Sequence, residues 1–198
     1  MRIKSSWFKH GRERTAEELA GALSFVIYRL ADNALKKTRQ ADFGIRVGTQ
    51  YFAFLTEFLL FLIQVADRIA YRRLPEQERH DLTSTLANRV AETHAENESR
   101  LLGGDMAECK QRFIDTLNRR AGGYAEFGYG ENGPDFAFTR YLAWCMNAVM
   151  DEKDSNWIID QMMSIEAPEA VEKVEKTFRN LLESKPREAR RRTSSSGE

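Results

Sequence analysis

Residues 51–70 read YFAFLTEFLLFLIQVADRIA, and this stretch decides how the chain folds. At about 100° per residue, its apolar side chains cover roughly half of a helix circumference. Gln50, Glu57, Gln64 and Arg68 form one polar stripe on the opposite side. A helix with so wide an apolar face must be covered on two or three sides by other elements. The stretch therefore predicts the central helix of a bundle.

The same stretch does not predict a membrane span. Its longest uninterrupted apolar run, 58–63, has six residues, whereas a spanning helix needs roughly 20. Glu57, Asp67 and Arg68 interrupt the wider segment, and a carboxylate near the middle of a bilayer costs about 3 kcal/mol. We expect a soluble core helix.

Composition favours one globular domain in a reducing compartment. The chain has 198 residues, of which 42% are hydrophobic and 30% charged, a balance typical of a folded domain. No apolar segment of signal-peptide length follows Arg2 and Lys4. Cys109 and Cys145 both fall on or near apolar helix faces, which favours buried free thiols over a disulfide. We therefore predict a cytoplasmic protein.

The formal net charge of zero conceals basic ends on an acidic body. Residues 1–14 carry a net charge of +4 and residues 185–198 a net charge of +3, so the segment between them carries −7. We expect a basic flexible N-terminal segment, a helical-bundle domain at 15–184 and a basic disordered tail at 185–198. Solvated tails are the favoured interpretation. The less favoured one is that Arg190, Arg191 and Arg192 contact nucleic acid or a membrane surface.

Helix signals follow one another along the whole body, and convincing strand patterns are absent from the sequence. Thr15 and Glu18 predict a capping box at the first helix. Pro75, Pro134 and Pro168 each suit the first position of a helix. We predict an all-α, single-domain bundle of five to seven helices, with principal helices at about 15–37, 45–74, 75–102, 105–122, 134–150 and 168–184 and a short amphipathic piece around 157–162.

Metal and catalytic signatures are weak. No glutamate lies three residues before a histidine, as a di-iron bundle requires. His94 and Glu98 share one helix face but lie among polar neighbours, so we expect that face to be solvated. We find no arrangement typical of a catalytic nucleophile. The sequence thus predicts no catalytic residue, no metal and no cofactor.

Two features remain as candidate contacts with a ligand or partner. Glu57 lies between apolar neighbours, and three interpretations stay open: a buried acid or base, an ion pair with an arginine of another helix, or a polar stripe that faces water. Residues 121–133 read AGGYAEFGYGENG. Their aromatic residues, Tyr124, Phe127 and Tyr129, are expected either to contact a ligand or partner, or to pack onto the bundle.

These observations favour a non-enzymatic protein-interaction or assembly module. Its expected partner is another protein or a second copy of the chain, with exposed parts of the broad apolar face of the central helix forming a homodimer contact. The alternative is a bundle with an interior pocket for a small apolar or aromatic ligand, and an enzyme is one form of it. In that case residues 121–133 would form the lid and Glu57 the buried polar group.

Overall fold

The computed structural model describes residues 15–183. It confirms the all-α, single-domain bundle. The helices are α1 (Ala16–Gln40), α2 (Thr49–Tyr71), α3 (Glu76–Leu102), α4 (Met106–Ala125), α5 (Phe136–Asn147), α6 (Glu152–Gln161) and α7 (Ala167–Glu183). A π turn, η2 (Met162–Glu166), joins α6 to α7. Strands β1 (Tyr129–Gly130) and β2 (Gly133–Pro134) form a short antiparallel hairpin before α5.

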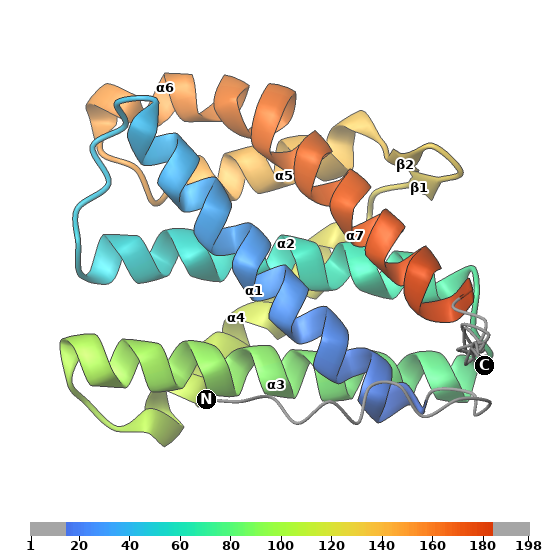
Figure 1. The fold of residues 1–198 in the computed structure, drawn as a ribbon. Coiled ribbons are helices and arrows are strands. Elements are labelled where there is room, and N and C mark those ends of the chain that lie inside the picture. Colours follow the sequence, from blue (N-terminus) through green and yellow to red (C-terminus); the bar gives the residue numbers. More distant parts are fainter. Residues whose placement is uncertain (1–14, 184–198) are drawn as a thin grey trace, which may run out of the picture.

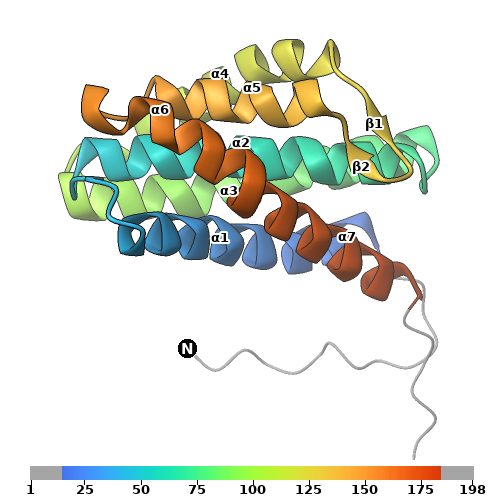
Figure 2. The same cartoon turned by 90° about the horizontal axis from the view of Figure 1, so that it is seen from above.

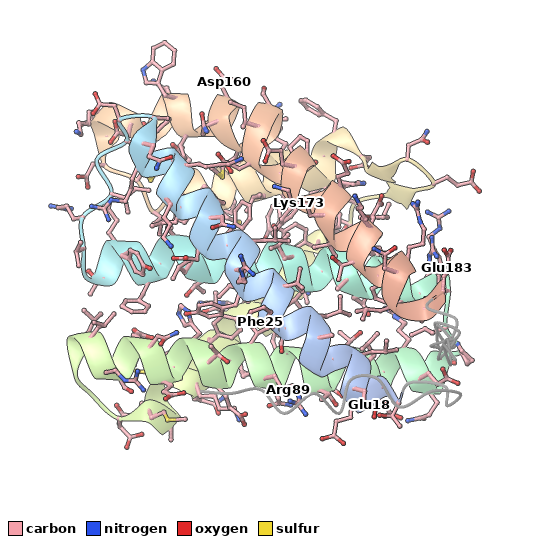
Figure 3. All side chains as sticks on the ribbon, in the orientation of Figure 1. Glu18, Phe25, Arg89, Asp160, Lys173 and Glu183 are labelled. Atoms are coloured by element: carbon pink, nitrogen blue, oxygen red, sulfur yellow. The ribbon has the colours of Figure 1, made fainter. Side chains whose placement is uncertain are left out.

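The helices are arranged in layers around α2. In Figure 1, α2 and α3 run side by side, α1 crosses in front of both, and α7 crosses in front of α2. Figure 2 shows α4 and α5 on the opposite side. Helix α2 contacts α1, α3, α4, α5 and α7. The outer face of α1 is turned to solvent and carries Phe25, which is exposed (Figure 3).

Burial of α2 confirms its central position. Phe54, Phe58, Leu59, Leu60 and Phe61 are fully buried. Helix α2 contributes thirteen buried apolar side chains, more than any other helix within residues 15–183, and burial of apolar surface stabilises the fold. Of the large apolar side chains of α2, Tyr71 alone is exposed. Other helices of the same chain cover this face, so little of it is exposed for the expected dimer contact, and dimerisation stays a prediction.

Several element boundaries differ from the prediction. The capping box is present: Thr15 accepts a hydrogen bond from the Glu18 amide, and the Glu18 carboxylate accepts one from the Thr15 amide. Helix α2, however, begins only at Thr49, after Gly48, whose φ of 127° suits glycine. Helix α4 continues through the glycines at which we expected it to end. Gly123 is needed there because the Tyr141 hydroxyl occupies the space of a Cβ.

Neither Pro134 nor Pro168 begins a separate helix. Pro134 lies in β2, and Asp135 caps α5 by accepting a hydrogen bond from the Phe138 amide. Pro168 lies inside a continuous helical path that runs from α6 to α7 through η2. The Ala167 amide donates five residues back, to the Met162 carbonyl. Pro168 has no amide hydrogen and its ring needs room in the preceding turn, and the wider π turn accommodates both.

No helix within residues 15–183 combines the length and the apolar character that crossing a membrane requires. The predicted basic ends, with Arg190, Arg191 and Arg192, lie outside the described residues.

Candidate functional site

A cleft of about 310 Å³ opens between α2, α3 and α4. Its walls combine apolar, hydroxyl and charged side chains. They are Thr49, Phe52, Ala53, Thr56 and Glu57 of α2, His94 and Glu98 of α3, Cys109, Arg112, Phe113, Thr116, Arg119 and Arg120 of α4, and Val149.

Glu57 is buried and forms an ion pair in this cleft. The Arg120 guanidinium donates to Glu57 through two nitrogens, with N–O distances of 2.6, 2.9 and 3.2 Å. These hydrogen bonds raise the pKa of Arg120. Arg120 also lies over the rings of Tyr141 and Trp144, 6.0 and 5.7 Å from their centroids. Of the three interpretations of Glu57, the structure shows the second, an ion pair with an arginine of another helix.

The thiol of Cys145 belongs to the same buried group. Burial and the neighbouring Glu57 carboxylate raise its pKa to about 12. Cys145 is therefore an unreactive thiol at neutral pH. Both cysteines are free and buried, as predicted.

Three arginines of α4 give the cleft a net positive charge. Arg112 pairs with Glu98 at 2.8 Å and also donates to the Cys109 sulfur at 3.2 Å. Arg119 donates to the Thr116 hydroxyl at 3.1 Å and has no acidic partner among residues 15–183. Two carboxylates thus face three guanidinium groups, which leaves one positive charge unpaired.

His94 lies at the floor of the cleft and is fully buried. Its ring packs between those of Phe52 and Phe113, with centroid distances of 5.5 and 5.2 Å. Its Nε2 lies 3.0 Å from the Thr56 hydroxyl. The prediction of a solvated face is wrong for His94 itself, whereas the neighbouring Glu92, Thr93 and Glu96 are exposed.

The other ring nitrogen of His94 is unsatisfied. Nδ1 is buried and has no hydrogen-bond partner in the described part of the chain. Burial, and to a smaller extent the Arg112 charge, lowers the pKa of His94 to about 4, so the ring is neutral at pH 7. A buried polar atom without a partner costs about 1–3 kcal/mol. The atom has almost no accessible surface, so its unmet hydrogen bond is a cost of packing the His94 ring between Phe52 and Phe113.

The aromatic residues of segment 121–133, which were predicted as ligand or partner contacts, lie outside the α2–α3–α4 cleft. Tyr124 is on α4, buried against Phe61, Phe138 and Tyr141. Phe127 packs on the Tyr141 ring at 5.6 Å. None of Tyr124, Phe127 and Tyr129 lines the cleft that contains Glu57, so these residues do not form a lid over it.

Arginines of α2 hold the irregular segment in place. Arg68 donates to the carbonyl oxygens of Tyr124 and Phe127, at 2.9 and 3.5 Å. Arg72 donates to the Gly130 carbonyl. The Tyr129 hydroxyl donates to Glu175 of α7 at 2.9 Å. The hairpin is therefore fixed to α2 and α7.

His94, Arg112 and Arg119 line the cleft but were not predicted as site residues from the sequence. A usable signal existed in α4, where Thr116 is one helical turn from the adjacent Arg119 and Arg120.

No group of three or more His, Cys, Asp or Glu side chains within residues 15–183 is placed to hold a metal ion. Comparison with protein-family models, curated proteins and solved structures gives no match. We therefore infer function from the geometry of the site.

Proposed function

We propose that the chain is a non-enzymatic binding protein whose α2–α3–α4 cleft holds a small organic anion, a carboxylate or a phosphate ester. The observation that carries this proposal is the Arg119 guanidinium, which lines the cleft and has no acidic partner among residues 15–183. The proposal modifies the alternative function predicted from the sequence, a bundle with a pocket for a small ligand. The ligand is now charged and not apolar, and residues 121–133 do not form a lid.

Charge and hydrogen-bonding capacity favour an anion. Guanidinium groups bind carboxylate and phosphate through paired hydrogen bonds. Thr116 adds a hydroxyl beside Arg119. Thr49 lies in the first turn of α2, and no side chain caps this end of the helix because the N-cap residue is Gly48. The positive end of the helix dipole lies here and favours an anion.

The remaining walls suit the uncharged part of a metabolite-sized molecule. Phe52, Phe113 and Val149 present apolar surface beside the arginines. A volume of about 310 Å³ lies at the lower end of the range of small-molecule sites. A ligand with one anionic group and a small ring or short alkyl chain matches both properties.

Isothermal titration calorimetry with three probes tests this proposal. Benzoate and phenyl phosphate carry the anionic group, and benzyl alcohol is the uncharged comparison. We expect the two anions to bind and Arg119→Gln to weaken them about tenfold, the cost of one charge-assisted pair. Arg100→Gln is the matched control, because Arg100 is an exposed arginine of α3 outside the cleft. The control should change the affinity by less than about twofold.

Native mass spectrometry of the untagged chain, purified from its own host, gives an independent measurement. Excess mass that matches an organic acid and disappears in Arg119→Gln would support the proposal. A bare chain, together with no binding of either anionic probe, would refute it.

A protein-interaction function, a homodimer and a cytoplasmic location remain predictions from the sequence. The interaction function is favoured by a second surface, a groove beside the β1–β2 hairpin that shares no residue with the cleft.

A further inference from the structure

A groove of about 340 Å³ lies on another part of the molecule, between the β1–β2 hairpin, the start of α5 and the η2–α7 segment. Figure 1 shows the hairpin beside these two helices. None of the residues that line the α2–α3–α4 cleft takes part in this groove. Its chemistry is therefore independent of the proposed anion site.

All charged side chains that line the groove are acidic. They are Asp135, Glu172 and Glu175, and the lining includes no lysine, arginine or histidine. Within residues 15–183, Glu172 and Glu175 form no ion pair. The Asp135 carboxylate accepts hydrogen bonds from the backbone amides of Gly128 and Phe138, at 2.8 and 2.7 Å. The groove thus offers three carboxylates that lack a cationic partner.

Apolar side chains lie between these carboxylates. Val171 and Met163 form part of the floor, and Pro134 and Pro168 line the sides. Phe136 is at the edge and is 68% exposed. The exposed Phe136 ring adds apolar surface that a bound partner is able to cover.

The walls of the groove are held in position before any partner binds. Tyr129 fixes Glu175 to the hairpin with a 2.9 Å hydrogen bond. Gly133 has a φ of 94°, and a Cβ there would lie 3.7 Å from Val171 and Glu175. This glycine lets the hairpin turn close to α7. A preformed surface loses little conformational entropy on binding.

We propose that this groove binds a peptide segment of a partner protein in which a lysine or arginine adjoins a bulky apolar residue. The basic side chain would pair with Glu172 and Glu175 on α7, and the apolar side chain would pack on Val171 and Phe136. Glu172 and Glu175 come from α7, and Asp135 and Phe136 come from the start of α5, so one extended segment in the groove is able to contact both helices at once.

Selection from a phage-displayed octapeptide library against the full chain tests this proposal. We expect enrichment of peptides in which arginine or lysine neighbours tryptophan, phenylalanine or leucine. The affinity of the most enriched peptide is then measured by fluorescence anisotropy. Phe136→Ser and Glu172→Lys should each weaken binding at least tenfold, and both residues are exposed, so the fold should tolerate the changes.

Glu183→Lys is the matched control, because it changes the same charge at the far end of α7 (Figure 3). It should alter the affinity less than twofold. Circular dichroism of each variant checks that the fold is retained. No enrichment, enrichment of acidic peptides, or equal loss of binding in all three variants would overturn the proposal. Because the cleft and the groove share no residue, failure here leaves the result with benzoate and phenyl phosphate unaffected.

Discussion

His94 is neutral in the folded chain because burial and the Arg112 charge lower its pKa from 6.5 to about 4. In the unfolded chain the ring is in water and titrates near 6.5. Between these values the unfolded chain binds more protons than the folded chain, so lowering the pH favours unfolding. The stabilisation is complete above pH 6.5 and is lost as the pH falls to about 4.

We expect the free energy of unfolding to decrease by about 3 kcal/mol over this window through His94 alone. Urea denaturation at pH 7, 5.5 and 4.5 measures it in the natural chain and in His94→Gln, which cannot titrate. The difference between the two chains should change with pH in the predicted direction. A constant difference would mean that His94 does not control this dependence.

The Glu57–Arg120 pair gives a second prediction for single residues. Glu57→Gln leaves a half-buried guanidinium without its carboxylate, and removing one partner of such a pair costs about 3 kcal/mol. The double variant Glu57→Leu with Arg120→Met removes both charges and should be closer to the natural chain in stability.

Chemical denaturation of Glu57→Leu, of Arg120→Met and of the double variant measures the coupling between the two side chains. Glu17→Gln is the control, because its pair with Arg89 is exposed and should contribute less than about 1 kcal/mol. Equal losses from Glu57→Gln and Glu17→Gln would contradict the role of the buried pair.

At the scale of elements, we can test whether the π turn η2 is needed to accommodate Pro168 in the continuous helical path from α6 to α7. Deleting Ser164, which is exposed, removes the extra residue of η2 while keeping the buried faces of both flanking helices in phase. The ring of Pro168 would then meet the carbonyl of the preceding turn, at a cost of about 3 kcal/mol. We expect the deletion to destabilise the chain by this amount and Pro168→Ala to restore most of it.

Deletion of Lys176, an exposed residue of α7, is the control. It rotates the last turns of α7 by about 100° and moves Phe178, which is fully buried, away from the core. Pro168→Ala should not rescue that variant. If thermal denaturation shows equal rescue in both deletions, Pro168 is not the reason for the π turn.

Element positions show what local patterns predict. The capping box at Thr15 was predictable because both of its hydrogen bonds join residues three apart. Pro168 was predicted to begin a helix because proline has no amide hydrogen to donate. A helix start and a π turn both accommodate a residue without this donor. The pattern of one segment does not distinguish the two.

For the whole molecule, the sequence predicted the all-α bundle and its central helix, since the width of an apolar face is a local property. It did not predict which helices cover the polar residues. Glu57 and Arg120 are 63 positions apart, and His94 is buried only because α2 and α4 cover that part of α3. The candidate site depends on these long-range contacts, so Glu57 was the one predicted site residue that lines the cleft.

The unbroken burial of residues 58–63 in α2 has a consequence for how the opening of this protein can be followed. An amide hydrogen in this run exchanges with deuterium only when the surrounding helices separate from α2, because every residue from 58 to 63 is buried. The exchange rate there reports unfolding of the entire bundle, whereas amides at the ends of α3 and α7 also exchange through local fraying. One helix thus records, without added denaturant, how often the whole molecule opens.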